Sequence, residues 1–388
     1  MPGPFPSPMQ RLLSIQKALR PMLTPLGAIY SGLMALRRQG YEHGLLPSWS
    51  PPAPTVAVGN IGWGGTGKTP LAGWLLSWAE ERGLRAALLT RGYRARPKSY
   101  PYHVQPGALA EEAGDEPLLL AREHPRAVVV VDPERSRGGR FACERFDPRF
   151  LVLDDGFQHL AVERDMNLVL LRAEDLGDQW NRVLPAGSWR EGRSALSSAS
   201  AFLLKVGPKT FQALEPLLRE RLEPLGKPVF SFSLTPVGLR SVSGGGQPEP
   251  VEGDYLLVSG VGNPAQVERT AAVFLGRPPA RHLVFPDHHF FTKRDVTRIQ
   301  MEAGSLRCSR VICTPKDAVK LGPLADESFS ALDLRLAFGP SLFTPARFDD
   351  WFGRRWEALE VRRDERLARA ARRAKPGRGA TAGGEHGT

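Results

Sequence analysis

The chain has 388 residues, 41% hydrophobic content and a formal net charge of +11, which is typical of a globular protein with two or three domains. Its three cysteines are too few for a disulfide framework, and Cys308 and Cys313 lack the second pair that a zinc site needs. We therefore expect a protein of a reducing compartment, without disulfides or structural zinc.

Residues 1–50 are predicted to form an N-terminal helical hairpin. Two short helices are expected within residues 9–39, the second starting at Thr24 and Pro25, which suit an N-cap and a first turn. No apolar segment of the signal-peptide kind is present, and the apolar stretch 21–36 is shorter than the ~20 residues of a spanning helix. The hairpin packs on the next domain, or dips a basic, amphipathic face into anionic lipid headgroups, and the two interpretations are compatible.

Residues 51–200 alternate short apolar strands with helical segments. The runs "TVAVGN" at 55–60 and "FLVLDDG" at 150–156 are typical of buried strands, and βαβ units of this kind form a mainly parallel sheet with helices on both faces. A second set of strands follows in residues 201–361, interrupted by a glycine- and proline-rich stretch at 241–250 that we expect to be a flexible loop. The predicted fold class is α/β, with a nucleotide-binding core and a second, smaller α/β domain.

Residues 362–388 are basic and then rich in glycine and alanine, with little apolar periodicity. This composition is typical of a disordered tail. The tail carries much of the positive excess, and its basic residues do not interleave with aromatic ones as they do in proteins that stack on bases. We therefore expect no nucleic-acid partner.

A glycine-rich turn between a strand and a helix predicts a phosphate site. The segment matches the pattern G-x-x-x-x-G-K-[ST] in the context that a P-loop requires. Backbone amides of such a loop converge on phosphate oxygens, the lysine reaches the β- and γ-phosphates, and the threonine hydroxyl ligates Mg²⁺. The residues concerned are Gly62, Gly64, Gly65, Thr66, Gly67, Lys68 and Thr69.

Two acidic residues follow a buried strand. Asp154 and Asp155 lie at its carboxyl end, where open α/β sheets bind ligands and where P-loop enzymes place a second holder of Mg²⁺. Gln158 and His159 come next and either donate to a sugar or phosphate or serve the structure.

Two further polar segments carry candidate chemistry. Asp115 and Glu116 open a predicted helix, where acids commonly complement the helix dipole. Asp287, His288 and His289 follow a strand of the second domain. Adjacent histidines diverge in extended backbone, so one histidine polarising a carboxylate is easier to build than a metal site.

Together these segments resemble one family, the tetraacyldisaccharide 4'-kinases. The likeness covers most of residues 20–325 and rests on the combination of "GGTGKTP", "GDEP", "DDGFQH" and "PDHHFFT", supported by "LTRGYRAR", "PAGSWRE" and "TPKDAVKL". The resemblance implies a P-loop kinase that moves the γ-phosphoryl group of ATP, with Mg²⁺, to the 4'-hydroxyl of an acylated glucosamine disaccharide 1-phosphate in lipid A biosynthesis. It also implies a peripheral protein on the cytoplasmic face of the inner membrane of a Gram-negative bacterium, with no obligatory protein partner.

Carried over to this sequence, the resemblance assigns a role to each matching position. Asp115 is expected to be the base that takes the hydroxyl proton, paired with His288 rather than His289. Glu116, Asp154 and Asp155 are expected to join Thr69 around Mg²⁺. The expected substrate contacts are Arg91, Gln158, His159 and Arg190.

The sequence departs from the family pattern at three places, of which one is the absence of the phenylalanine often found after the proline in "VSGVGNPAQVERT", and two rival functions remain. Gly62 and Trp63 replace the usual Thr-Val before the paired glycines, and Trp189 stands in "PAGSWRE" before Arg190. One rival is a membrane-associated P-loop switch ATPase, although such proteins often carry a lysine where Trp63 stands. The other is a polyanion-binding protein that uses the basic tail.

Overall fold

The computed structural model describes the backbone of residues 8–243 and 251–374 and the side chains of residues 14–243 and 251–361. The described strands form one sheet in the order β10-β9-β11-β12-β8-β7-β6-β1-β5-β2-β4-β3. The strands are β1 (Thr55–Asn60), β2 (Ala86–Thr90), β3 (Tyr102–His103), β4 (Val128–Val131), β5 (Phe150–Asp154), β6 (Met166–Leu171), β7 (Ala201–Lys205), β8 (Val229–Ser241), β9 (Tyr255–Ser259), β10 (Arg281–Val284), β11 (Arg310–Cys313) and β12 (Phe329–Leu342).

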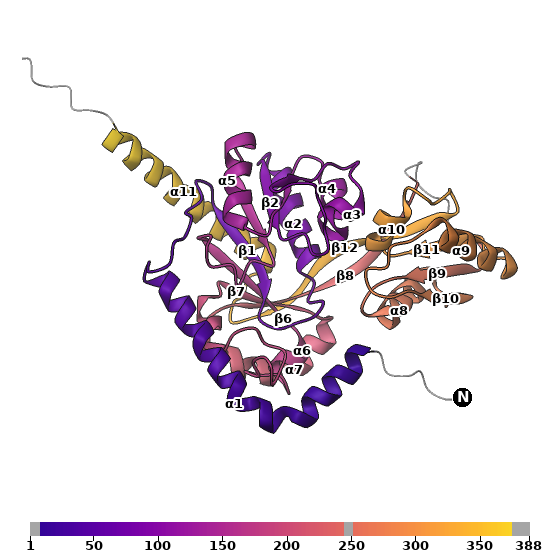
Figure 1. The fold of residues 1–388 in the computed structure, drawn as a ribbon, viewed down its shortest axis with the longest axis horizontal. Coiled ribbons are helices and arrows are strands. Elements are labelled where there is room, and N and C mark those ends of the chain that lie inside the picture. Colours follow the sequence, from indigo (N-terminus) through magenta and orange to yellow (C-terminus); the bar gives the residue numbers. More distant parts are fainter. Residues whose placement is uncertain (1–7, 244–250, 375–388) are drawn as a thin grey trace, which may run out of the picture.

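Helices cover both faces of this sheet (Figure 1). They are α1 (Pro8–Glu42), α2 (Lys68–Glu81), α3 (Ala110–Ala113), α4 (Asp115–Glu123), α5 (Arg135–Phe146), α6 (Ala173–Leu176), η1 (Arg193–Ser198), α7 (Pro208–Leu222), η2 (Glu223–Leu225), α8 (Pro264–Leu275), α9 (Lys293–Ser305), α10 (Pro315–Leu321) and α11 (Phe348–Ala374).

The first lobe is built on the parallel strands around β1. Alternate residues point to opposite faces, so that Val56 and Val58 pack towards α2, whereas Ala57 packs with the strand residues that face α5. Both faces are buried, which explains why these strands read as continuous apolar runs. The predicted α/β fold with a mainly parallel sheet is confirmed.

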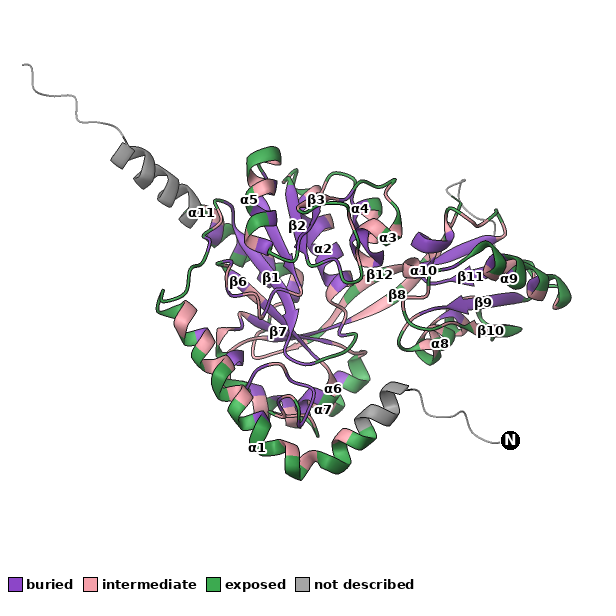
Figure 2. Ribbon diagram, in the orientation of Figure 1, coloured by how far each residue is buried: buried purple, intermediate pink, exposed green. Residues whose placement is uncertain are grey.

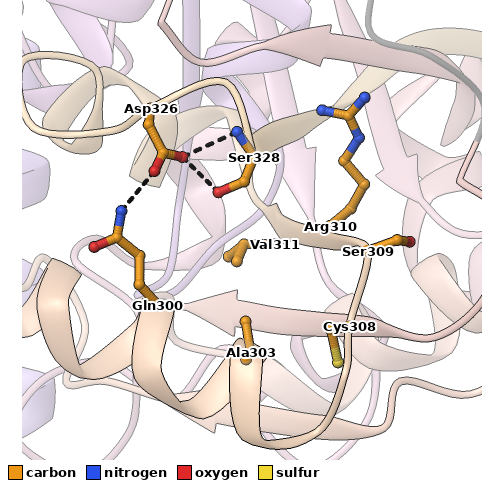
Figure 3. Close-up of a pocket in the computed structure, with 9 residues that line it drawn as sticks. Gln300, Ala303, Cys308, Ser309, Arg310, Val311, Asp326 and Ser328 are labelled. Carbon is orange, nitrogen blue, oxygen red and sulfur yellow. Dashed lines mark hydrogen bonds between the residues drawn. The ribbon is translucent and has the colours of Figure 1, made fainter.

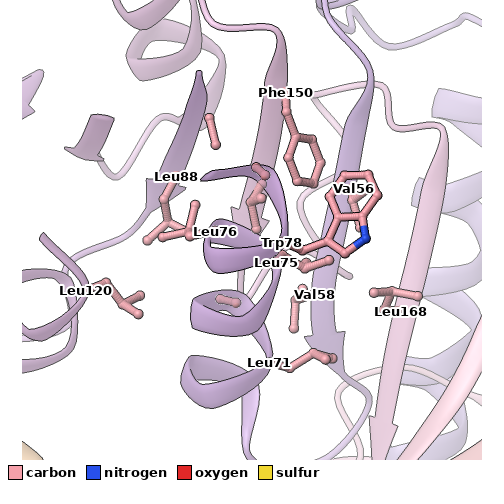
Figure 4. Packing of buried hydrophobic residues seen from close by; sticks show 14 of the residues in the cluster. Val56, Val58, Leu71, Leu75, Leu76, Trp78, Leu88, Leu120, Phe150 and Leu168 are labelled. Atoms are coloured by element: carbon pink, nitrogen blue, oxygen red, sulfur yellow. The ribbon is translucent and has the colours of Figure 1, made fainter. Parts of the chain in front are cut away.

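An aromatic cluster attaches the last helix to the helix of the P-loop. Trp78 of α2 lies edge-on to Phe352 and Trp356 of α11, with ring centroids 4.9 and 5.3 Å apart, and Phe150 adds an edge contact at 6.4 Å. Figure 4 shows Trp78 among the aliphatic residues between α2 and the sheet. α11 continues to Ala374, so the first part of the predicted tail is helical; one short helix was expected there, and residues 375–388 lie outside the described part.

The second lobe contains β9, β10, β11 and the helices α8, α9 and α10 (Figure 1). Two long antiparallel strands, β8 and β12, join it to the first lobe. The first four residues of β8 are buried in the first lobe and the first four of β12 are buried in the second, while the middle of both strands is half-exposed.

The sheet does not break near residue 200, where the sequence predicted a domain boundary. β7 pairs with β6, and α11 packs on α2, so residues on both sides of the second lobe belong to the first lobe's core. The domain limits stay a prediction, but the connection between the lobes lies within β8 and β12. The loop predicted at 241–250 lies largely outside the described residues, since β8 ends at Ser241 and residues 244–250 are not described.

The N-terminal element is one helix, α1, and not the two helices that were predicted. Pro21 and Pro25 lie inside it, and Figure 1 shows α1 bent along its length. Each proline removes one amide donor and bends a helix, but packing of neighbouring turns lets the helix continue. Thr24 does not cap a new helix, because its hydroxyl donates to the carbonyl of Arg20 at 2.8 Å.

A buried ion pair fixes the C-terminal half of α1 to the first lobe. The guanidinium of Arg38 donates to one carboxylate oxygen of Glu191 from Nε at 2.9 Å and from Nη2 at 2.7 Å. The two side chains are only 7% and 4% exposed. Arg38 also donates to Ser198 at 3.1 Å and stacks over the ring of Phe157. The helix is therefore held by a desolvated, hydrogen-bonded contact.

Candidate active site

The glycine-rich turn closes over the start of α2. Gly67 has φ +91°, a conformation that favours glycine, and a Cβ there would come within 2.9 Å of the Phe232 ring. Lys68 and Thr69 follow as the first residues of α2. The Lys68 ammonium lies 3.1 Å from Oδ1 of Asn60 and 3.4 Å from Oδ1 of Asp155. The lysine is thus held at the carboxyl end of the sheet.

The segment 183–190 pairs with the chain that enters the P-loop. The amide of Trp63 donates to the carbonyl of Ser188 at 3.1 Å, and the amide of Arg190 donates to Ile61 at 2.7 Å. Trp189 is fully buried, with its indole N–H on Asp175 at 3.3 Å. This indole therefore belongs to the core, whereas the neighbouring Arg190 is half-buried and pairs with Asp155.

The paired aspartates have different environments. Asp154 is 6% exposed and accepts from Thr90 at 3.0 Å, while its Oδ1 is buried without a hydrogen-bond partner. Burial and then the Glu116 carboxylate raise the pKa of Asp154 to about 6. Asp155 pairs with Arg190 at 3.1 Å as well as with Lys68. Although burial acts to raise the pKa of Asp155, these two cations hold it below its ordinary value.

Glu116 contacts both lobes. One oxygen accepts from the hydroxyl of Thr69, and the other pairs with the ammonium of Lys316 on α10 of the second lobe. Burial acts to raise the pKa of Glu116, but Lys316 and the Thr69 hydrogen bond keep it below its ordinary value. The carboxylate is therefore ionised and next to the P-loop threonine.

The acidic residues fit a divalent cation of the Mg²⁺ kind. A buried carboxylate oxygen on Asp154 lacks a partner, and Glu116 and Asp155 act on the same carboxyl group electrostatically. Among the described residues no group of three potential ligands forms a closed metal cage. Mg²⁺ does not need one, since it usually keeps several waters and binds one or two carboxylates plus substrate phosphates.

Asp115 and His288 come together from the two lobes. Nδ1 of His288 lies 3.0 Å from Oδ2 of Asp115, and the Lys320 ammonium lies 3.3 Å from the same oxygen. Burial alone raises the pKa of Asp115, but His288 and Lys320 outweigh it and lower that pKa. His289 points elsewhere, with Nε2 3.2 Å from Asp295. The structure thus pairs Asp115 with the histidine that the sequence favoured.

A group of cations surrounds His159. Burial, and then Arg135 and other arginines including Arg91, lower the pKa of His159 to about 4. Nε2 of His159 and Nε of Arg135 are buried without hydrogen-bond partners. Gln158 lies beside this group: its amide donates to the carbonyl of Asn60 at 2.8 Å, its side-chain oxygen accepts from Arg190 at 3.5 Å, and its own carbonyl accepts from Arg37 at 3.3 Å. Asp154, Asp155 and Asp132 act on Arg135 electrostatically, but Nε of Arg135 and Nε2 of His159 have no hydrogen-bond partner, and an anionic ligand could provide one.

The sequence interpretation missed three residues of this region. Arg135 opens α5 directly after β4, and Lys316 and Lys320 lie one turn apart on α10. Arg135 had a weak signal, since it follows the carboxyl end of a buried strand, where ligand contacts gather. The two lysines lie in "TPKDAVKL", a segment that supported the family resemblance, but their carboxylate partners could not be predicted because these lie about two hundred residues away in the sequence.

A cavity in the second lobe does not contribute to this site. It has a volume of about 260 Å³ and lies between α9 and β11 (Figure 3). The polar groups that line it are hydrogen-bonded to one another: Asp326 accepts from Gln300 at 2.6 Å and from the amide of Ser328 at 2.9 Å. It contains none of the predicted site residues.

The fold and the site together define a P-loop protein of the α/β class. A phosphate loop after β1, an acidic cluster from the end of β5 and the start of α4, and an Asp–His pair from two lobes lie close together. The family model of tetraacyldisaccharide-1-P 4'-kinase, LpxK, matches residues 19–352. The chain belongs to this family, as its motifs indicated.

Individual relatives agree with this assignment. The chain is 52% identical over 347 residues to the tetraacyldisaccharide 4'-kinase of Nitratidesulfovibrio vulgaris, a match that covers 89% of this chain and 97% of the relative. It is 49% identical over 356 residues to that of Oleidesulfovibrio alaskensis, covering 89% and 98%. The crystal structure of LpxK from Aquifex aeolicus in complex with ATP superposes with a TM-score of 0.65 at 30% identity, covering 83% of this chain and 95% of that chain.

Proposed function

We propose that this chain transfers the γ-phosphoryl group of ATP to the 4'-hydroxyl of tetraacyldisaccharide 1-phosphate, a step of lipid A biosynthesis. The observation that carries the proposal is the Asp115–His288 pair beside the P-loop. Asp115 is followed by Glu116, which accepts from Thr69, so the pair lies next to the position of the terminal phosphate. A switch ATPase has no need of a proton acceptor for a sugar hydroxyl at this place.

The P-loop residues would hold the nucleotide. The backbone amides around Gly64 to Gly67 and the N-terminus of α2 attract phosphate oxygens, and Lys68 supplies a point charge. Thr69, Glu116, Asp154 and Asp155 would hold Mg²⁺, which neutralises charge on the phosphate oxygens when bound. Lys68 pairs with Asp155 and Lys316 pairs with Glu116. When ATP is bound, both ammonium groups would pair with its phosphate oxygens instead.

The contacts favour His288 as the proton acceptor and Asp115 as its partner, the reverse of the roles expected from the sequence. The pKa of Asp115 is lowered by His288 and Lys320 against the effect of burial, so its carboxylate is a weak base. Donation from Nδ1 of His288 to Asp115 leaves the lone pair on Nε2 free for the hydroxyl of the acceptor. General-base catalysis of this kind contributes roughly 10²- to 10⁴-fold to a rate.

The cluster around His159 would bind a negatively charged part of the acceptor. Arg91 is exposed, while Arg135 is buried, so the cluster extends from the surface to the carboxyl end of β5. Arg190 borders it and pairs with Asp155. Phosphate on the sugar would satisfy the buried nitrogens of Arg135 and His159 that lack partners.

The exposed face of α1 would bring the protein to the membrane. No helix in the described part of the chain is long and apolar enough to cross a bilayer. However, the outer side of α1 is largely exposed (Figure 2), and it carries large apolar side chains spaced by three and four residues, which form one stripe. The stripe consists of Ile15, Leu19, Met22, Leu26, Ile29, Leu33 and Leu36.

This stripe contains no charge between Arg20 and Arg37. An apolar face of this kind lies in the boundary between headgroups and acyl chains. We infer a peripheral protein of the cytoplasmic face of the inner membrane. The test is sedimentation with vesicles of phosphatidylethanolamine and phosphatidylglycerol. Leu26→Glu with Ile29→Glu is expected to stay in the supernatant, while the matched change Val273→Glu on α8 leaves vesicle binding unchanged. Equal binding of all three proteins would refute the role of α1.

The kinase proposal is tested by transfer of labelled γ-phosphate from ATP and Mg²⁺ to tetraacyldisaccharide 1-phosphate in detergent micelles. Wild type is expected to label the lipid, and His288→Ala and Asp115→Ala are expected to lose at least about 100-fold in kcat. His289→Ala is the matched control, because that ring pairs with Asp295 instead. ATP hydrolysis without labelled lipid, unaffected by Asp115→Ala, would support the switch ATPase.

A further inference from the structure

The motif "TPKDAVKL" folds as α10 and its N-cap, and the kinase chemistry above leaves one of its lysines without a role. Lys320 is almost completely buried, with a side chain 2% exposed. Its ammonium lies 3.3 Å from Oδ2 of Asp115 in the first lobe and 3.3 Å from Oδ1 of Asp317 on its own helix. It also lies 5.6 Å from the centre of the Phe291 ring. A cation is thus enclosed between two carboxylates and an aromatic face.

Asp317 links this lysine to the backbone beside His288. Its carboxylate, which is fully buried, accepts from the amide of Gly260 at 3.0 Å through Oδ2. The carbonyl of Gly260 accepts from the amide of His288 at 3.2 Å. The ring of His288 then donates to Asp115, which returns to Lys320. The five residues form a closed circuit of polar contacts.

The circuit holds His288 in an unfavourable backbone conformation. His288 has φ +60°, in the left-handed region that non-glycine residues seldom adopt. The loop persists because the bond to Gly260 fixes its backbone and the bond to Asp115 fixes its ring. There is little room for a side chain at Gly260, because a Cβ there would come within 3.1 Å of the Asp317 carboxylate and 3.2 Å of the Pro286 carbonyl.

Burial of an ammonium is not explained by packing. Removing a charge from water is costly, and replacing a buried ion pair with apolar side chains of similar volume is often neutral or stabilising. The position of Lys320 is explained if the charge has a task, namely to hold the Asp115 carboxylate at the distance where it meets Nδ1 of His288. Lys316, one turn earlier on α10, pairs with Glu116 in the same way that Lys320 pairs with Asp115. Two lysines of α10 therefore contact two successive carboxylates of α4.

We propose that Lys320 and Asp317 are positioning residues for phosphoryl transfer, which align the His288 imidazole with Asp115 across the two lobes. The proposal rests on the proposed function, in that His288 takes the proton of the acceptor hydroxyl. α10 brings the ammonium, and the Gly260 loop brings the imidazole, so the pair is complete only when the second lobe lies against α4. Lys320 acts on Asp115 and Asp317 acts on the His288 backbone, and neither touches the reacting atoms.

The decisive experiment is a double-mutant cycle in the full-length enzyme with labelled ATP and lipid acceptor in micelles. Lys320→Met keeps the length of the side chain and is expected to lower kcat about 100-fold, the cost of a misplacement near 1 Å. KM for ATP is expected to stay within about twofold, because the P-loop lies in the other lobe. In a His288→Ala background the same change is expected to have no further effect on kcat. Lys293→Met, an exposed lysine of α9, is the matched control and should keep full activity.

A second readout does not depend on turnover. Two-dimensional ¹⁵N–¹H spectra of the histidine rings report whether Nδ1 of His288 carries a proton hydrogen-bonded to Asp115. That signal is expected in wild type and is expected to weaken in Lys320→Met and in Asp317→Asn. If Lys320→Met does not fold, as judged by thermal melting, Asp317→Asn, which keeps the side-chain shape, takes its place in both measurements.

The outcomes separate the two proposals. Wild type without any labelled lipid refutes the kinase function, and the ring spectra then still decide on the circuit. An active wild type with kcat unchanged in Lys320→Met, or with an equal loss in the presence and absence of His288, overturns the positioning role. A loss that appears as a raised KM for ATP with an unchanged kcat also overturns it, since that pattern indicates a disturbed nucleotide site.

Discussion

The substitution Arg38→Met tests whether the buried contact of α1 stabilises the first lobe. It would leave the carboxylate of Glu191, which is 4% exposed, without its cation, and the other oxygen of Glu191 already lacks a partner. Breaking a buried pair on one side costs about 3 kcal/mol or more. For a chain of 388 residues that unfolds cooperatively, this corresponds to a fall in Tm of about 4 °C.

The assay is differential scanning calorimetry, combined with limited proteolysis of α1. Arg38→Met is expected to melt lower and to be cut within α1 sooner than wild type. The double variant Arg38→Met with Glu191→Leu removes both charges and is expected to recover most of the stability, because an apolar pair of similar volume replaces a buried ion pair at little cost. A single variant that melts within 1 °C of wild type, roughly 1 kcal/mol, or a double variant less stable than the single one, would refute the reasoning.

Two further predictions concern the phosphate and acidic sites. Gly67→Ala strains a residue at φ +91° and pushes a Cβ against Phe232. Isothermal titration calorimetry should therefore show ATP binding at least about tenfold weaker, a loss of about 1.4 kcal/mol. The control is Gly207→Ala, which faces open space and should bind ATP as wild type does. The folded-state pKa of Asp154 is about 6, above the ordinary 3.8. Ionising this carboxyl therefore lowers the stability of the fold: the loss begins as the pH rises above about 4 and is complete above about 6. Asp154→Asn cannot ionise, and calorimetry of the nucleotide-free protein should show a higher Tm than wild type at pH 8, with the difference shrinking towards pH 4. A difference that stays constant over this range, or one that grows towards low pH, would contradict the assignment.

The parts of the site that were predictable from sequence are those whose chemistry is local. The P-loop is a single stretch in which glycine, Lys68 and Thr69 must follow a strand and precede a helix, and Asp154 and Asp155 directly end a buried strand. Parallel strands bring such carboxyl ends to one edge of the sheet, so their meeting follows from the fold class.

The parts that were not predictable depend on contacts between distant segments. Lys320 reaches Asp115 only because α10 packs on α4 across the lobes. We propose a different proton acceptor from the one expected from the sequence, because the contact of Lys320 with Asp115 cannot be predicted from the linear pattern. α1 was divided at Thr24 and Pro25, which are good start signals, but tertiary contacts such as that of Arg38 with Glu191 stabilise one continuous helix. The domain limits were drawn at a change in pattern, while the chain returns to the first lobe through β12.

That return has a consequence for the architecture. Because the chain leaves the first lobe along β8 and re-enters it along β12, the second lobe is an insertion into a self-contained nucleotide-binding fold. Leu234 pairs with Leu336, and Thr235 pairs with Arg335, so a two-residue Asn-Gly turn could join the strands there as a hairpin. Such an excision would remove His288 and Lys320 and keep the whole P-loop. Because the phosphate loop lies wholly in the first lobe whereas His288 lies in the second, this deletion would separate the nucleotide site from the Asp115–His288 pair and show what the first lobe does alone.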